Sequence, residues 1–455
     1  MKSLSFWGKF TVITILAISL LVGCQNTVDT SSSTTTEGTS STEALETTTV
    51  TVTTEATNEA LISSAEKVIW GQQQGTANED LGTAIAVDAS GNSCAVGFTS
   101  GAVTGDNLGS NDVLISYFDV TGENSWTIQT GTAQTDIATS VVFDKASDLY
   151  VTGTTTGNFG PEAGVGEIFI QKISKDGKIQ WTKQYGGQPH ATSTHITLDS
   201  EGNLFICGST NGALQGPGKG RSDAYVMKLD ASGNVLWTSQ WGTELADEAT
   251  GLAMDQEGNL YVIGSTEGTL GTEALGRKDV FYSQLSATGE IRNSYQYGTA
   301  LDEYATKIVV DQDQNVFLAG WTNGELVAPK QGKGDSILIK ADVNGTVLWQ
   351  KQFGTALWDG IHGIILDKTN PTRVIVGGCS NYDNCQAFII NYDTDGNVVW
   401  NKTLIPEFST CGREIAMDDQ GNLYQTGGTH GQLYGTAAFE GPESDIFIYK
   451  ISAND

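Results

Sequence analysis

The chain has 455 residues, with 53 Asp and Glu against 24 Lys and Arg, a formal net charge of −29 and a sequence pI near 4.3. Such a surface repels nucleic acid and anionic lipid headgroups, so the composition argues against both as partners of the chain as a whole. Gly is abundant (55) and Pro scarce (7), and short apolar runs bounded by Gly, Asn and Asp recur, which is typical of an all-β protein.

The amino terminus resembles the signal of a bacterial lipoprotein. Two lysines precede an apolar run at 10–22, which is too short to span a bilayer comfortably, and Leu21-Val22-Gly23-Cys24 resembles a lipobox. The resemblance implies that residues 1–23 are a cleaved signal peptide and that Cys24 is lipidated. We therefore expect a bacterial cell-envelope location with membrane contact through the lipid only. In a Gram-negative host, Gln25 after the cysteine would direct the protein to the outer membrane or cell surface.

Residues 24–65 consist almost entirely of Thr, Ser, Glu and Ala. A stretch of this composition cannot bury enough apolar surface to fold, so we expect a disordered tether. The folded domain is then expected to occupy residues 66–455.

A repeat of 51–56 residues fills that domain. It is marked by a tryptophan, with Asn293 in its place once: Trp70, Trp126, Trp181, Trp237, Trp349 and Trp400. A fixed period of this length is typical of propellers and solenoids. Each unit reads as four strands: an apolar run ending in Asp (250–255, TGLAMD), a run of the type GNLYVIG (258–264), a run opening at Asp or Glu, and the Trp strand.

The joints between these strands carry turn chemistry. D-x-x-G-N joins the first two strands and D-x-x-G-x-x-x-W the last two, so that Asp caps a tight turn and Gly supplies the positive φ. The Trp is a large plate for packing one blade on the next. Seven first strands occur, but the last unit lacks a Trp strand and residues 66–75 supply a spare one. We predict a seven-bladed β-propeller of four-stranded blades, closed by an N-terminal strand that pairs with the last blade.

Over residues 66–455 the repeat resembles the SBBP-type seven-bladed β-propeller repeat, on the strength of GNLYVIGST, the Asp that opens the third strand and D-x-x-G-x-x-x-W. The resemblance implies a secreted or lipid-anchored bacterial protein, and most members have no established activity. Two departures stand out. One is Asn293, and the other is blade six, where the Gly-rich loop and its opening Asp are missing.

The connections from strand two to strand three and from blade to blade share one face and are the longer ones, so ligand binding is expected there. Five acidic residues precede innermost strands on this face: Asp80, Asp136, Asp247, Glu303 and Asp359, with Ala191 and Thr410 as exceptions. They could form a ring at the channel mouth that holds Ca²⁺. The alternative, which their recurrence with the repeat favours, is that each caps its own turn. No other cofactor is predicted.

Aromatic residues gather next to the missing loop of blade six. We predict a ligand notch formed by Tyr304, Trp321, Trp358 and His362 and edged by Lys330 and Lys333. Aromatics with a few polar groups suit sugars, peptides or small ligands. The alternative is a set of separate surface aromatics that support loops. The predicted partner is a protein, peptide or glycan on the long-loop face, and the propeller itself is expected to be monomeric.

Cys379 and Cys385 flank the shortened hairpin of blade six, a spacing that predicts a disulfide in an exported protein. Cys411 could compete for either partner, and Cys94 and Cys207 lie within strand patterns. No GxSxG, HExxH or phosphate loop occurs, so no catalytic residue and no metal site is predicted. The sequence favours a binding or scaffolding module. The alternative is a propeller enzyme acting on carbohydrate, or a quinoprotein-like dehydrogenase, since these dehydrogenases carry a similar Trp-docking motif.

Overall fold

A computed structural model describes residues 68–164, 166–186, 190–271, 273–381, 385–404, 409–434 and 443–452. The predicted signal peptide, Cys24 and the tether lie outside these ranges. Within them, no helix is long and apolar enough to cross a membrane.

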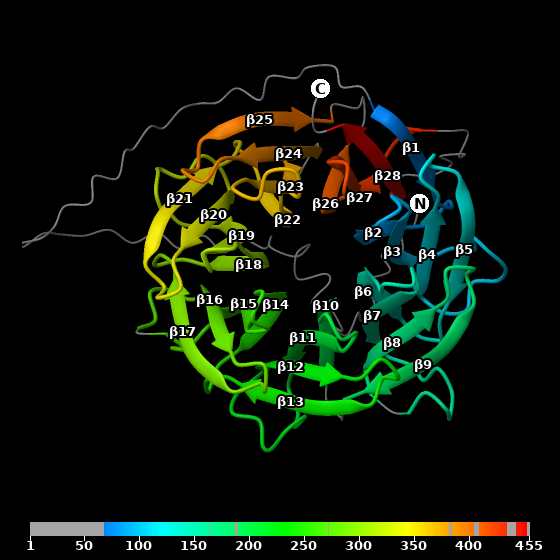
Figure 1. The fold of residues 1–455 in the computed structure, drawn as a ribbon, viewed down its shortest axis with the longest axis horizontal. Coiled ribbons are helices and arrows are strands. Elements are labelled where there is room, and N and C mark those ends of the chain that lie inside the picture. Colours follow the sequence, from blue (N-terminus) through cyan, green and yellow to red (C-terminus); the bar gives the residue numbers. More distant parts are fainter. Residues whose placement is uncertain are drawn as a thin grey trace, which may run out of the picture. The chain divides into compact units, whose positions relative to one another are not determined.

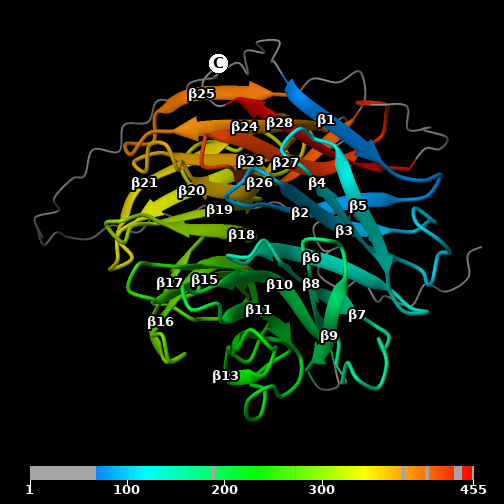
Figure 2. The same ribbon diagram turned by 45° about the vertical axis from the view of Figure 1, so that its right-hand side comes forward.

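The described residues form seven four-stranded antiparallel sheets, arranged as blades around a common centre (Figures 1 and 2). Blade one contains β2 (Asp80–Val87), β3 (Ser93–Thr99), β4 (Asp112–Phe118) and β5 (Asn124–Thr130). Blade two contains β6 (Asp136–Phe143), β7 (Leu149–Thr155), β8 (Ile168–Ile173) and β9 (Ile179–Tyr185). Blade three contains β10 (Ala191–Leu198), β11 (Leu204–Thr210), β12 (Asp223–Leu229) and β13 (Val235–Trp241).

Blade four contains β14 (Asp247–Met254), β15 (Leu260–Thr266), β16 (Asp279–Leu285) and β17 (Ile291–Tyr297). Blade five contains β18 (Glu303–Val310), β19 (Val316–Thr322), β20 (Asp335–Ala341) and β21 (Val347–Phe353). Blade six contains β22 (Gly360–Leu366), β23 (Val374–Ser380), β24 (Gln386–Tyr392) and β25 (Val398–Thr403). Blade seven contains β26 (Thr410–Met417), β27 (Asn422–Thr429), β28 (Asp445–Ser452) and β1 (Val68–Gln74).

Ring closure occurs as the spare Trp strand predicts. β1 pairs antiparallel with β28, with Gln72 opposite Ile448, and so becomes the outermost strand of blade seven (Figure 1). Blade seven also bonds to blade one, because the backbone N–H of Asp80 donates to the carbonyl of Ser444 at 2.8 Å. The predicted all-β fold with seven four-stranded blades is confirmed.

Each blade is covered on both faces by its neighbours, which explains its unbroken apolar runs. The middle strands of blade four, β15 and β16, are buried at every residue, whereas the outermost strand β17 is exposed over its first three residues. Strands buried on both faces read as continuous apolar sequence rather than as alternation. The core therefore lies between the blades, in a series of clusters around the ring.

The repeated Trp packs against the last hairpin of the next blade. A Cβ on Gly177, for example, would lie 2.9 Å from the ring of Trp126, so the glycine of D-x-x-G-x-x-x-W leaves room for the preceding blade's Trp. Where Asn293 replaces the Trp, Tyr295 takes over two residues later on the same side of the strand. Its ring lies against Gly345 and 5.0 Å from the ring of Tyr282.

The innermost strands share a β-bulge, and its residue links neighbouring blades. The bulge residue is threonine in the first five blades, His362 in blade six and Arg413 in blade seven. The hydroxyl of Thr83 donates to the carbonyl of Ala138 in the next blade at 2.7 Å, and Thr139, Thr194 and Thr306 make equivalent bonds. Blades six and seven therefore lack the threonine that makes this bond between neighbouring blades.

Candidate functional site

The long loops of blades three to five are held by a glutamine of the outermost strand. In blade three, Gln240 accepts from the backbone N–H groups of Leu214 and Gln215 and donates to the carbonyl of Gly212 at 2.9 Å and to Asp223 Oδ2 at 2.8 Å. Gln296 and Gln352 do the same in blades four and five. This role was missed in the sequence, although the repeated Gln two residues before the Gly was its signal.

The acidic residues that precede the innermost strands each serve their own turn. All five are buried, and each accepts hydrogen bonds from both the backbone N–H and the hydroxyl of the Thr four residues earlier: Asp80, Asp136, Asp247, Glu303 and Asp359. Asp247 and Glu303 also accept from a Thr hydroxyl of the second strand, at 2.5 and 2.6 Å. The carboxylates are therefore engaged within their own blades, in the capping arrangement that their recurrence favours.

A second carboxylate lies close to each of these acids, and it explains the glycine that follows the Trp strand. A Cβ on Gly131 would lie 2.7 Å from Asp112 Oδ1 and 3.0 Å from Asp136 Oδ2. The same pair of carboxylates borders the equivalent glycines Gly242, Gly298 and Gly354. Burial raises the pKa of the inner acids, and for Asp80 it raises the pKa to about 6, because a charged carboxylate is poorly solvated there.

The structure brings together the aromatic members of the predicted notch. Tyr304 on β18 and Trp321 on β19 are cross-strand neighbours whose rings stack at 4.0 Å with an interplanar angle of 12°. Trp358 meets Trp321 edge-on at 5.1 Å. His362 and Trp321 both border Gly360, whose Cβ would lie 3.4 Å from His362 Nε2 and 3.6 Å from Trp321 Cδ1. We call Tyr304, Trp321 and Trp358 the aromatic cluster.

The predicted lysines do not sit over this cluster. Among the residues that the structure describes, Lys330 and Lys333 make no ion pair and no cation–π contact, although the backbone N–H of Lys333 donates to the carbonyl of Leu357 beside Trp358. The lysine in that place is Lys278 of the blade-four loop. Its Nζ lies 5.0 Å from the centroid of Tyr304 and 3.1 Å from Glu248 Oε2.

The aromatic cluster occupies positions that the repeat does not require to be aromatic. The residues equivalent to Trp321 in blades two, three and four are Thr154, Ser209 and Ser265. Blade one has Phe98 there, but this ring is paired with Leu81 and not with a second aromatic residue. In blade six the residue equivalent to Tyr304 is Gly360, which contributes no side chain beside Trp321. The cluster is therefore a feature of one sector of the ring and not of the scaffold.

Three charged or polar side chains from alternate blades meet at the ring centre below this sector. Lys307 of blade five donates to His195 Nδ1 of blade three at 3.0 Å and lies 2.5 Å from Glu414 Oε2 of blade seven. Because an ammonium group can only donate, Nδ1 of His195 accepts, and the imidazole is neutral. Burial first and Lys307 second lower the pKa of His195 well below its usual range. Gly251 and Gly363 occupy the equivalent positions of the blades between.

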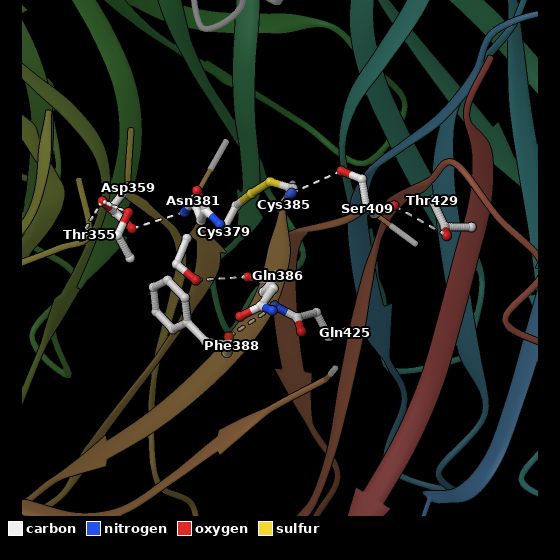
Figure 3. Close-up of a disulfide and its surroundings, with 11 residues drawn as sticks. Thr355, Asp359, Cys379, Asn381, Cys385, Gln386, Phe388, Ser409, Gln425 and Thr429 are labelled. Carbon is white, nitrogen blue, oxygen red and sulfur yellow. Dashed lines mark hydrogen bonds between the residues drawn. A yellow bond between two sulfur atoms is a disulfide. The ribbon is translucent and has the colours of Figure 1, made fainter. Parts of the chain in front are cut away.

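A disulfide clamps the shortened loop of blade six (Figure 3). Cys379 at the end of β23 is bonded to Cys385, just before β24, with a Cα–Cα distance of 6.0 Å. The backbone N–H groups of Asn381 and Cys385 donate to Asp359 and Ser409 on either side. Cys411 is a free thiol whose Sγ lies within 4.8 Å of both bonded sulfurs, while Cys94 and Cys207 are free and buried.

The family model of the SBBP β-propeller repeat matches residues 125–160, 180–214, 236–271 and 294–326. The chain carries SBBP repeats. Each match begins in or next to the outermost strand of one blade and runs into the next blade, so the sequence repeat is offset from the structural blade by one strand. The same offset leaves β1 free to complete blade seven.

Curated relatives of this SBBP propeller match only part of it. Regulatory protein FlaEY of Caulobacter vibrioides is 29% identical over 192 residues, which cover 38% of this chain and 20% of that protein. A WD repeat-containing protein of Acanthamoeba polyphaga mimivirus is 22% identical over 218 residues, covering 38% of this chain and 16% of that protein. The match thus spans a fifth or less of the length of these relatives.

Solved structures similar to the SBBP propeller are distant in sequence. Sqt1 from Chaetomium thermophilum aligns with a TM-score of 0.46 at 11% identity, covering 85% of this chain and 99% of that one. A protein of unknown function from Dyadobacter fermentans aligns with a TM-score of 0.45 at 9% identity, covering 70% and 95%. At these values neither structure informs the function of this chain.

Proposed function

We propose that this SBBP propeller is a binding module and that its ligand is a glycan seated on the aromatic cluster of blades five and six. The observation that carries the proposal is the stack of Tyr304 on Trp321 with Trp358 edge-on beside it. All three side chains are partly exposed, and the positions of Tyr304 and Trp321 hold no aromatic residue in blades two to four. Exposed aromatics that the fold does not need are a common mark of a ligand site.

Polar groups beside the cluster suit a hydroxylated ligand. Asn323 Oδ1 is buried without a hydrogen-bond partner among the described residues, and it borders Gly334 together with the ring of Trp358. Lys278 lies over the opposite end of the stack, at Tyr304. A sugar ring could place its C–H face on an aromatic ring and its hydroxyls against such groups, which is the usual combination in binding sites for small polar ligands.

The test is a glycan screen followed by titration with tryptophan fluorescence and calorimetry. We expect a glycan that binds the wild-type protein, and a roughly tenfold or greater loss of affinity in Trp321→Ala, since an aromatic contact contributes about 1.5 kcal/mol beyond its buried area. Leu348→Ala is the matched control, because this exposed residue lies on the outermost strand of the same blade. Equal affinity in wild type and Trp321→Ala would refute the site.

We also propose that the module is held at the bacterial cell envelope by a lipid on Cys24, on the basis of the lipobox resemblance at residues 21–24. The protein expressed in a bacterial host should partition into the detergent phase on Triton X-114 separation, and its amino-terminal peptide should carry acyl mass. Cys24→Ser should partition into the aqueous phase. A wild-type protein that is itself found in the aqueous phase would exclude the anchor.

A further inference from the structure

Arg413 is a buried cation without a counterion. Only 9% of its surface is exposed, and its Nε has no hydrogen-bond partner. No carboxylate among the described residues forms an ion pair with it; the neighbouring Glu414 is instead paired with Lys307. The comparably buried Lys340 and Lys450 each have a carboxylate, Asp311 at 3.9 Å and Asp418 at 3.2 Å. A buried charge without a partner is strongly unfavourable, so its presence calls for an explanation.

The scaffold does not require an arginine at this position. Arg413 occupies the bulge of β26, and the equivalent residue in blades one to five is threonine, which bonds to the next blade in most of them. A threonine at this position would allow the same bond to the next blade without burying a charge. The arginine therefore costs stability that a simpler residue would keep, a pattern expected of a functional group.

Arg413 lies on the innermost strand next to that of His362, which borders the aromatic cluster. Arg413 is close enough to His362 to contribute to the lowered pKa of that imidazole, whose burial is the larger cause, so His362 is neutral at neutral pH. The backbone carbonyl of Arg413 lies 3.2 Å from the position of a Cβ on Gly363, which follows His362. His362 in turn borders Gly360 opposite Trp321. The residues therefore follow one another around the inner strands in the order aromatic cluster, Gly360, His362 and Arg413.

We infer that Arg413 binds the carboxylate of the ligand and that the ligand is an acidic sugar, with its ring on the aromatic cluster. A guanidinium matches a carboxylate through two parallel hydrogen bonds, and the absence of a protein counterion leaves the N–H groups of Arg413 for that purpose. The formal charge of −29 opposes long polyanions, so a single terminal uronate fits better than an anionic polymer. The inference rests on the proposed glycan-binding function and specifies the charge of the ligand.

The test compares D-glucuronate with D-glucose as probes, by calorimetry on the wild-type protein, Arg413→Gln and Arg413→Lys. Glucuronate should bind the wild type, and Arg413→Gln should weaken it by about 10- to 100-fold, the usual range for a charged hydrogen-bonded partner. Arg413→Lys should retain part of the affinity. N-acetylphenylalanine and its amide form a second pair of probes.

The melting temperature of an Arg413 variant shows whether a loss of binding comes from misfolding. Because Arg413 is unpaired in the free protein, Arg413→Met should fold and should melt at the same or a higher temperature than the wild type. A clear drop in its midpoint would show a structural partner and overturn the inference. Neutral glycans that bind through Trp321 with no effect of Arg413→Gln would leave the proposed function standing and overturn the inference alone. Binding of N-acetylphenylalanine but not of glucuronate would replace the acidic sugar by a peptide carboxylate.

Discussion

Asp418→Ala is expected to destabilise the domain by weakening the contact between the last and first blades that closes the ring. Asp418 is 3% exposed and begins the first hairpin of blade seven, where its Oδ1 accepts from the backbone N–H groups of Gln420 and Asn422 at 3.0 and 2.8 Å. Its Oδ2 lies 3.2 Å from Nζ of Lys450 and 3.1 Å from the hydroxyl of Tyr424, whose single proton is shared between this oxygen and the carbonyl of Gly91 in blade one. One carboxylate therefore supports the turn, an internal ion pair and the contact between the last and first blades.

The expected loss in the free energy of unfolding follows from Lys450, which loses its counterion. Lys450 is 5% exposed, so removing Asp418 leaves a buried charge uncompensated, which typically costs about 3–5 kcal/mol. For a domain of this size, a loss of about 4 kcal/mol lowers the melting midpoint by roughly 5 °C. The assay is thermal unfolding followed by circular dichroism, with urea unfolding as a second measure.

Two further variants separate the ion pair from the turn. Asp230 makes the same turn bonds, from Ser232 and Asn234 at 2.9 Å, but is only half-buried and forms no ion pair with a buried lysine among the described residues, so Asp230→Ala should lose less stability. Adding Lys450→Met to Asp418→Ala should recover much of the loss, because the unpaired charge is removed. Equal losses in the two Asp variants, or no recovery in the double variant, would refute the reasoning.

Three more outcomes follow. Burial raises the folded-state pKa of Asp80 to about 6 from 3.8, so the contribution of its protonated carboxyl to stability is full below about pH 4 and is lost as the pH rises through 6. The melting midpoint should therefore rise when the pH is lowered from 7 to 5, and it should rise less in Asp80→Asn. Gly131→Ala should cost about 1–3 kcal/mol by crowding two carboxylates, whereas Gly218→Ala, whose Cβ would lie 3.3 Å from the carbonyl oxygen of Gly212, should cost clearly less; similar losses would contradict this reading. Gln296→Ala should speed proteolysis within residues 267–278 without unfolding the domain, and an unchanged cleavage rate would argue against its role in holding that loop.

Local chemistry explains why the architecture could be predicted from sequence. The tight turns, the apolar runs and the Trp of most units depend on neighbouring residues and recur around the ring, so the strands and their order are determined by short-range patterns. Ring closure followed from counting, since the last unit lacked a Trp strand and the first stretch supplied one. The replacement of Asn293 by Tyr295 was not predicted, because it depends on which side of the strand faces the next blade.

The site was predictable only in part. The aromatic cluster could be placed because Tyr304, Trp321 and Trp358 break the repeat in adjoining units, and such exceptions are visible in sequence. The contact of His195, Lys307 and Glu414 was not predicted, because it joins residues more than 100 positions apart through the geometry of the closed ring. The lack of a counterion at Arg413 depends on where every neighbouring acid points.

The proposed ligand lies on the aromatic cluster and not elsewhere on the ring. Hydrogen–deuterium exchange with and without a bound glycan tests it most directly. We expect added protection in residues 302–306, 319–323 and 355–362, and none in the tight D-x-x-G-N turns on the opposite face, such as 255–259. Protection centred on those turns, with the three segments unchanged, would contradict it.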